Sequence, residues 1–225
     1  MTASYPSLVI FGSSNILSDL FDAALATGIR PTKVVLDEPE ECGIRDKPLQ
    51  QRLLELEPLS PPPALLTMEA FSPEAGELYL LGPTTPRRAT LAKKLEVQWG
   101  LNFHTLIHPT AYVSPLATLS AGVFVGANSV IAPGTRLAEH VFVNRGVTIG
   151  HDNRIGAFCR IQPGAALGGL SEFGDGVTVG IGARTLERLR VGEGAVIAGG
   201  AVVLEDVPAR VMVAGIPARI KKQLD

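Results

Sequence analysis

The sequence is dominated by an aliphatic side chain that returns every six residues between positions 107 and 203. Seventeen positions follow this spacing, and fifteen of them hold Ile, Leu or Val, with Phe173 and Thr185 as the exceptions. A helix with 3.6 residues per turn does not produce a period of six, and neither does a strand that alternates inward and outward side chains. Coils of short strands joined by tight corners do produce it. The pattern therefore predicts a parallel β-helix with one inward side chain on each side of every coil.

Two neighbouring positions of the repeat support the same interpretation. The residue two places before each aliphatic side chain is mostly small or β-branched, and the residue directly after it is often glycine. If three hexapeptides form one coil, residues about 18 apart stack at the strand spacing of ~4.8 Å. The aliphatic ladders then fill the interior together with the small residues, and glycine is expected to ease the corners. The region predicts a prism of several coils held by a continuous apolar core.

The first hundred residues instead alternate short apolar runs with amphipathic stretches. Strands are predicted at residues 7–11, 33–36 and 78–81, and helices at 16–25, about 49–56 and about 86–99. We expect Ser14 or Asn15 to cap the first helix and Gly28 to end it. Strands that alternate with helices predict a parallel sheet in a doubly wound α/β domain. The chain is therefore expected to fold as two domains, residues 1–104 and 105–225.

Charge and composition narrow the functional classes. The 20 basic and 22 acidic residues give a formal net charge of −2, which offers no basic footprint for nucleic acid or an anionic membrane. No stretch has the length and apolarity of a membrane span, and the N-terminus lacks the pattern of a signal peptide. The two cysteines, Cys42 and Cys159, cannot form a disulfide framework or a zinc cluster. We expect a cytoplasmic protein without nucleic-acid partners or membrane insertion.

Four histidines are available for proton transfer near neutral pH, and His151 stands out among them. It lies two residues after Ile149, which places it on an exposed corner of the predicted coil. Gly169, preceded by Gly168, is one coil further along and is expected to stack directly over His151. A position without a side chain leaves room for an acyl group and offers a backbone N–H to a developing oxyanion. The pattern indicates a site for acyl transfer.

Two segments of the repeat region resemble a known family. VNRGVTIGHDNRIGAFCRIQPGAALGG at residues 143–169 and DVPARVMVAGIPAR at residues 206–219 are similar to the bacterial sialic acid O-acetyltransferases and nucleotide-linked amino-sugar N-acetyltransferases. The resemblance implies a left-handed β-helix after a Rossmann-like domain that binds the nucleotide part of a nucleotide sugar. The C-terminal segment is also expected to fold back as a capping tail, because any solenoid must cover its open end. It also implies acetyl-CoA as the acyl donor, no metal, and a homotrimer whose active sites lie between subunits.

The same resemblance assigns roles to individual residues. His151 matches the general base, Asp152 the acidic residue that orients it, and Gly169 the glycine whose amide holds the acetyl carbonyl. Asn144 matches an asparagine close to the acceptor, and Arg160 replaces a second histidine near the acetyl group. Coenzyme A is expected to contact Gly168, Arg160, Gly199, Gly200, Ala214, Gly215, Pro217 and Arg219. The nucleotide sugar is expected to contact Gly12, Ser13, Ser14, Asp37, Glu38, Gly82 and Arg87, whereas Asn15 and Ile16 stand where the family has a glycine–histidine pair.

The preferred hypothesis is an acetyl-CoA-dependent N-acetyltransferase that acts on a nucleotide-linked amino sugar for surface glycan biosynthesis. The alternative is an O-acetyltransferase, or a longer-chain acyltransferase, acting on a sialic acid or related sugar with the same machinery. A zinc lyase of the carbonic anhydrase type needs three histidine ligands, whereas the regular coils offer only His140 and His151. A hexapeptide scaffold without catalysis predicts that substitution of His151 changes no activity.

Overall fold

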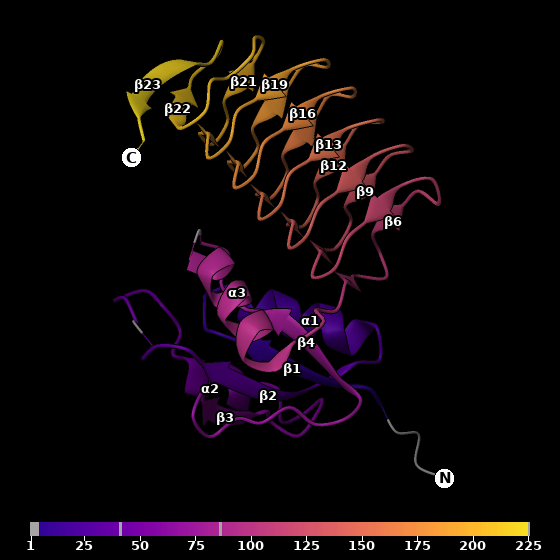
Figure 1. Ribbon diagram of the computed structural model, residues 1–225, viewed down its shortest axis with the longest axis vertical. Coiled ribbons are helices and arrows are strands. Elements are labelled where there is room, and N and C mark those ends of the chain that lie inside the picture. Colours follow the sequence, from indigo (N-terminus) through magenta and orange to yellow (C-terminus); the bar gives the residue numbers. More distant parts are fainter. Residues whose placement is uncertain (1–4, 41, 86, 225) are drawn as a thin grey trace. The chain divides into compact units, whose positions relative to one another are not determined.

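The computed structural model describes residues 5–40, 42–85 and 87–224, and the chain divides into two compact units, Met1–His104 and Thr105–Asp225. The first unit contains helices and a small sheet, and the second is a stack of coils (Figure 1). Within the part of the chain that the structure describes, no helix has the length and apolarity needed to cross a membrane.

The N-terminal unit contains one parallel sheet with the strand order β3-β2-β1-β4. Its elements are β1 (Ser7–Phe11), α1 (Leu17–Ala26), β2 (Arg30–Leu36), α2 (Leu49–Leu54), β3 (Ala64–Thr67), β4 (Glu77–Leu81) and α3 (Arg87–Trp99). Leu8, Val9 and Ile10 of β1 have no exposed surface, because a central parallel strand is covered on both faces. The predicted alternation of parallel strands with helices is confirmed.

The structure of this unit differs from expectation in one strand that was not predicted and one helix cap that was predicted wrongly. The sequence pattern does not predict β3, because this edge strand exposes three of its four residues and its sequence, Ala-Leu-Leu-Thr, has no alternation of apolar and polar side chains. The helix α1 has Ile16 at its N-cap without a side-chain cap, so the prediction that Ser14 or Asn15 caps it is wrong. The Ser14 hydroxyl instead donates to the Gly82 carbonyl at 2.8 Å. Pro86, where the third helix was expected to begin, lies outside the described residues.

The second unit is a three-sided parallel β-helix. One sheet contains β5 (Leu106–Ile107), β8 (Phe124–Val125), β11 (Phe142–Val143), β14 (Arg160–Ile161), β17 (Thr178–Val179), β20 (Val196–Ile197), β22 (Val211–Ala214) and β23 (Arg219–Gln223). A six-stranded sheet contains β6 (Tyr112–Val113), β9 (Val130–Ile131), β12 (Thr148–Ile149), β15 (Ala166–Leu167), β18 (Arg184–Thr185) and β21 (Val202–Val203). A five-stranded sheet contains β7 (Thr118–Leu119), β10 (Arg136–Leu137), β13 (Arg154–Ile155), β16 (Glu172–Phe173) and β19 (Arg190–Val191).

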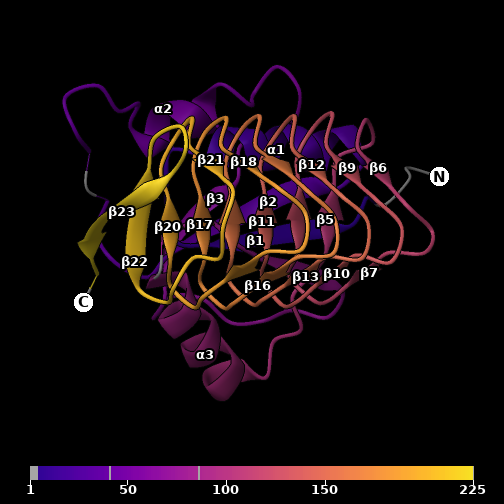
Figure 2. The same ribbon diagram turned by 90° about the horizontal axis from the view of Figure 1, so that it is seen from above.

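The register of these sheets confirms the predicted stacking of three hexapeptides per coil. Arg136 pairs with Arg154, and Thr148 pairs with Ala166, so each residue lies over the one that follows it by three repeats. The side chains of the six-residue pattern form the interior, where Ile131 and Val143 have no exposed surface. Figure 2 shows the successive coils from above, with the strands of each sheet standing in a row. The hydrophobic ladders therefore hold neighbouring coils together.

The glycines that follow the aliphatic positions serve close packing between coils. A Cβ added at Gly150 would lie 2.7 Å from the Gly169 nitrogen, and one at Gly180 would lie 2.5 Å from the Gly199 nitrogen. The left-handed backbone conformation falls two residues further into the corner, as at Asp152 with a φ of 56°. The prediction that these glycines ease the turn of the corner is therefore wrong. Glycine is required because a side chain at these positions would collide with the backbone of the next coil.

The C-terminal segment covers the last coil. The strand β22 joins the eight-stranded sheet beside β20, and β23 pairs with β22 in the antiparallel direction. An isolated bridge between Val191 and Val207 extends the five-stranded side in the same region. These pairings occupy backbone groups that the open end of a β-helix would otherwise expose.

Candidate active site

His151 lies on the corner between the six-stranded and the five-stranded sheets, directly after β12. Its side chain is 60 % exposed, and its Nδ1 atom lies 2.8 Å from Oδ2 of Asp152. Sequence neighbours on a flat strand point apart, but the left-handed conformation of Asp152 turns its carboxylate back to the ring. A carboxylate accepts hydrogen bonds, so this contact favours a proton on Nδ1 and a free lone pair on Nε2. The Nε2 atom is therefore available as a base.

Gly169 lies against the ring of His151 from the next coil. A Cβ added at Gly169 would lie 3.0 Å from both Nε2 and Cδ2 of His151 and 2.9 Å from its carbonyl oxygen. The Leu170 amide donates to that same carbonyl at 2.8 Å, which joins the two corners. Within the described part of the chain, the Gly169 amide has no hydrogen-bond acceptor. The side-chain-free position thus places a spare backbone donor beside the exposed base, as an oxyanion site requires.

Asn144 lies on a different corner, where the eight-stranded sheet meets the six-stranded sheet. Its side chain is buried, its Oδ1 accepts the Arg145 amide at 2.8 Å, and its carbonyl accepts the Ser129 hydroxyl at 2.7 Å. Gly199 and Gly200 follow β20 on the same edge of the prism. The whole six-stranded side separates this edge from that of His151. A single chain therefore does not bring these two groups of predicted residues together.

Arg160 lies on β14 of the eight-stranded sheet, whereas His151 lies at the corner between the other two sheets. Its Nε donates to the Thr178 hydroxyl at 2.9 Å, and burial lowers the pKa of its guanidinium. Four more residues predicted to contact coenzyme A lie at the end of the same sheet, in β22, β23 and their connection: Ala214, Gly215, Pro217 and Arg219. Gly168, also predicted to contact it, instead follows β15 on the edge of His151. Arg219 is exposed, with its guanidinium 4.0 Å from the carboxylate of Glu205.

The predicted nucleotide-sugar residues gather at the carboxyl ends of β1, β2 and β4. Gly12 and Gly82 bring two loops into contact, because a Cβ on Gly82 would meet the Gly12 carbonyl oxygen and the Pro83 ring lies where a Cβ on Gly12 would stand. Arg87 lies 3.2 Å from Asp37 and also pairs with Glu38. A polar pocket of about 390 Å³ opens here, and its lining includes Ser13, Ser14, Glu38 and Arg87.

Three further residues of this pocket were not singled out from the sequence as binding residues. The Asn15 amide donates to Asp46 at 2.7 Å, and the guanidinium of Arg52 donates to the Asn15 oxygen at 2.8 Å. The pKa of Asp46 is lowered by the hydrogen bond from the Gly43 amide and then by the one from Asn15. Asp46, in the loop before α2, and Arg52, in α2 itself, lie far from Asn15 in sequence, and the fold brings the three together. Asn15, which belongs to this polar network, stands where the family that the sequence resembles has a glycine–histidine pair.

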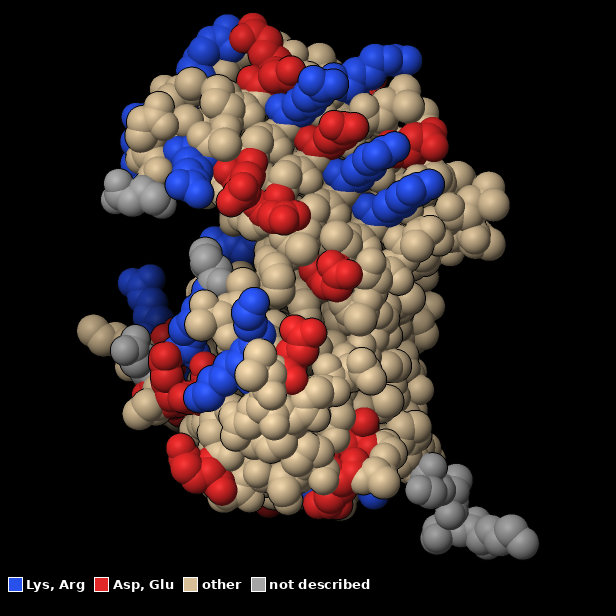
Figure 3. Space-filling view, in the orientation of Figure 1, with Lys and Arg blue, Asp and Glu red and all other residues tan. Residues whose placement is uncertain are grey.

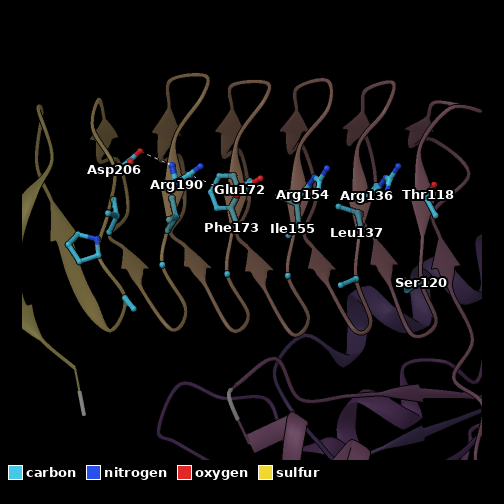
Figure 4. Close-up of a pocket in the computed structure, with 18 residues that line it drawn as sticks. Thr118, Ser120, Arg136, Leu137, Arg154, Ile155, Glu172, Phe173, Arg190 and Asp206 are labelled. Carbon is cyan, nitrogen blue, oxygen red and sulfur yellow. Dashed lines mark hydrogen bonds and ion pairs between the residues drawn. The ribbon is translucent and has the colours of Figure 1, made fainter.

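A second hollow, of about 870 Å³, lies along the five-stranded sheet and does not include His151. Arg136, Arg154, Glu172 and Arg190 project from successive strands into one row, and the Arg190 amide donates to Asp206 at 2.8 Å (Figure 4). Figure 3 shows basic and acidic side chains interspersed over the β-helix.

In residues 5–40, 42–85 and 87–224, no three His, Cys, Asp or Glu side chains gather as metal ligands would.

No protein-family model matches the sequence, and no curated protein matches it significantly. A solved structure of a perosamine N-acetyltransferase mutant from Caulobacter crescentus, in complex with CoA and GDP-perosamine, is similar with a TM-score of 0.83 and 26 % identity. That match covers 98 % of this chain and 100 % of the other.

A second solved structure is the acetyltransferase domain of PglB from Neisseria gonorrhoeae in complex with acetyl coenzyme A. It is 27 % identical with a TM-score of 0.74, and the match covers 97 % of this chain and 100 % of the other. WeeI from Acinetobacter baumannii, at 20 % identity and a TM-score of 0.69, shares the fold. Both units of the chain fall within these matches. The chain is therefore similar, over nearly its whole length, to solved acetyltransferase structures, among them a perosamine N-acetyltransferase.

Proposed function

We propose that the protein is an acetyl-CoA-dependent N-acetyltransferase acting on a nucleotide-linked amino sugar in surface glycan biosynthesis. The observation that carries the proposal is the corner where the exposed His151 ring, held by Asp152, lies against Gly169, whose amide has no acceptor among the described residues. The similar structures support the class of substrate, because one holds CoA with GDP-perosamine and another holds acetyl coenzyme A.

In this proposal the sugar amine attacks the thioester carbonyl as Nε2 of His151 removes its proton. A C–N bond forms, the C–S bond breaks, and the proton on His151 passes to the departing thiolate. The Asp152 carboxylate keeps the ring in the tautomer that can accept the proton. The Gly169 amide donates to the oxygen that becomes negative when the amine attacks. Acetyl-CoA supplies the acyl group, and the step requires no metal.

We infer that the site is completed by another copy of the chain in a homotrimer of left-handed β-helices. The edge with His151, Gly168 and Gly169 would face the edge of a neighbouring copy that carries Asn144, Gly199 and Gly200. Coenzyme A would lie in the groove between them, toward Arg160 and the C-terminal residues Ala214, Gly215, Pro217 and Arg219. The separation of the two edges within one chain supports this inference.

We also propose that residues 1–104 form a Rossmann-like domain for the nucleotide part of the acceptor, and that residues 105–225 form the acyltransferase domain. The pocket at the carboxyl ends of the strands supports this assignment, because parallel sheets bind nucleotides at that edge. Gly12, Gly82 and the two serines Ser13 and Ser14 would contact phosphate oxygens. Arg87, Asp37 and Glu38 would contact the ribose or base. Such a protein would work in the cytoplasm, where both substrates are made.

The test is thiol release from acetyl-CoA with a panel of UDP-, GDP- and dTDP-linked amino sugars and with free sialic acid. Wild type and His151→Ala are compared at equal folded concentrations. Release with one amino sugar, lost in the variant, is the expected result and names the acceptor. Release with sialic acid alone would replace the proposal with O-acetylation. Equal release by wild type and His151→Ala would remove His151 from the mechanism.

A further inference from the structure

A column of buried polar side chains lies behind the corner that carries His151. Thr135, Asn153 and Ser171 occupy the interior position two residues before Leu137, Ile155 and Phe173, and their exposed fractions are 0, 0 and 1 %. The corresponding interior residues on the other sides of the prism are mostly apolar, such as Val147 and Val177. Burying amide and hydroxyl groups costs free energy unless every group is paired. A polar column at this one side therefore requires an explanation.

The column is hydrogen-bonded to both corners of the proposed site. The carbonyl of Gly150, directly before His151, accepts the Thr135 hydroxyl at 2.7 Å and the Asn153 side-chain amide at 2.7 Å. The carbonyl of Gly169 accepts the Ser171 hydroxyl at 3.3 Å. The column thus contacts the peptide that directs His151 and the residue that faces its ring.

Asn153 also joins the two coils. Its Nδ2 donates to the Gly150 carbonyl, and its Oδ1 accepts the Ser171 amide at 3.0 Å. The orientation of the amide is fixed, because a flipped side chain would set oxygen against the carbonyl and NH₂ against the amide. An aspartate would lose the donor, and an aliphatic residue would lose both bonds. Asn153 thus links the coil of His151 to the coil of Gly169 through a side chain fully enclosed in the prism.

The corner at Gly150 differs from other corners of the β-helix in the hydrogen bonds that its carbonyl accepts. Among the described residues, its carbonyl is the one that accepts two buried side-chain donors. At the corner of Gly174, one carbonyl accepts a single buried donor, the Cys159 thiol at 3.0 Å. No predicted site residue lies at that corner. The bonding therefore concentrates where the position of a side chain matters most for acyl transfer.

We propose that Thr135, Asn153 and Ser171 are positioning residues that set the separation of the His151 ring from the Gly169 amide. This inference rests on the proposed function, because it concerns the same base and the same oxyanion donor. The Gly150 carbonyl, held by two bonds, fixes the peptide plane from which the His151 side chain departs. The bonds of Ser171 fix the opposing corner. Errors of about 1 Å in such geometry cost about 100-fold in rate.

The test compares Asn153→Ala and Ser171→Ala with the matched control Cys159→Ala in the full-length protein. The control also removes a buried donor to a corner carbonyl, and Cys159 is 1 % exposed. Thermal unfolding gives the stability of each variant, and thiol release gives kcat and KM well below the unfolding temperature. We expect kcat to fall about 10-fold or more in the two column variants, with KM for the acceptor unchanged. The control should keep wild-type kcat at a similar loss of stability.

A second readout does not need activity. The four histidines of the chain give few ring signals after ¹⁵N labelling of histidine, and the ring ¹⁵N shifts report the tautomer. We expect the His151 ring to lose the Nδ1-protonated form in Asn153→Ala and Ser171→Ala, and to keep it in Cys159→Ala. Thr135→Val serves as a second variant if Asn153→Ala does not fold. It removes the Thr135 bond to the Gly150 carbonyl and the one from the Asn153 backbone amide at 3.3 Å, but it leaves the Asn153 side-chain bond to Gly150 in place.

The outcomes separate this inference from the proposed function. Wild-type protein without thiol release would contradict the function, and the ring tautomer would still decide the positioning role. Column variants with wild-type kcat and a wild-type His151 tautomer would overturn the inference. Equal losses of kcat in Ser171→Ala and Cys159→Ala would also overturn it, because general destabilisation would then account for both.

Discussion

The substitution Gly169→Ala tests the proposed geometry with one methyl group. The added Cβ would lie 2.9 Å from the His151 carbonyl oxygen and 3.0 Å from Nε2 and Cδ2 of the ring. Favourable carbon contacts lie at ~3.5–4.0 Å, so the ring or the corner must move by roughly 0.5–1 Å. No left-handed conformation is involved at this glycine, and the effect is therefore a steric one.

A displacement of this size has different consequences for rate and for stability. Misplacement of a catalytic group by ~1 Å costs about 100-fold, so we expect kcat to fall about 30- to 100-fold, or roughly 2–3 kcal/mol in activation free energy. Overpacking of a tight contact typically lowers the free energy of unfolding by ~1–3 kcal/mol. The methyl group also narrows the space for the acyl group, and the loss should appear in kcat more than in KM for the acceptor.

Gly174→Ala is the matched control. A Cβ there would lie 2.6 Å from the Glu193 nitrogen, an even closer contact at a corner without predicted site residues. The assay is thiol release from acetyl-CoA at a temperature where thermal scans show both variants folded. We expect Gly174→Ala to lose at least as much stability and to retain its kcat. A Gly169→Ala variant with kcat within twofold of wild type would refute the proposed contact between the base and its oxyanion donor.

Three further predictions follow from other parts of the chain. Thr185→Val should raise the free energy of unfolding by about 1 kcal/mol, because the buried Thr185 hydroxyl has no partner among the described residues; a lower melting temperature would contradict this. Arg87→Ala should raise the Kd for the nucleotide sugar about 10-fold in calorimetry and leave kcat unchanged, because Arg87 pairs with Asp37 and Glu38 in the N-terminal pocket. Lys47→Ala, which breaks an exposed ion pair with Glu55, is its control and should leave the Kd unchanged. Burial lowers the pKa of His104 from its ordinary value of 6.5, so the unfolded chain takes up this proton at a higher pH than the folded chain does. The free energy of unfolding should therefore fall as the pH drops through 6.5, and His104→Gln should flatten this slope in urea titrations.

The β-helix was predictable because its repeat ties sequence spacing directly to spatial stacking. Once three hexapeptides form a coil, the residue over His151 must be Gly169, and the structure brings the two into contact. The small α/β unit was predictable in outline from its apolar strands. The edge strand β3 was not, because an exposed strand leaves no periodic pattern.

Other features depend on contacts that no local pattern encodes. The network of Asn15, Asp46 and Arg52 forms because a loop brings distant side chains together. The contact between His151 and Asp152 depends on one left-handed residue in the corner. The buried column did leave a signal, because Thr135, Asn153 and Ser171 are polar residues at successive interior positions of one side. That signal gains meaning only once their bonds to Gly150 and Gly169 are known.

The most direct test of the central claim is the mass of a nucleotide-linked amino sugar after incubation with acetyl-CoA and the protein. Wild type should add one acetyl group to the sugar amine and leave the nucleotide attached, and His151→Ala should leave the acceptor unchanged over the same period. Acetylation by His151→Ala at the wild-type rate would contradict the assignment of the base. No acetylation of any amino sugar by folded wild-type protein would contradict the proposed reaction itself.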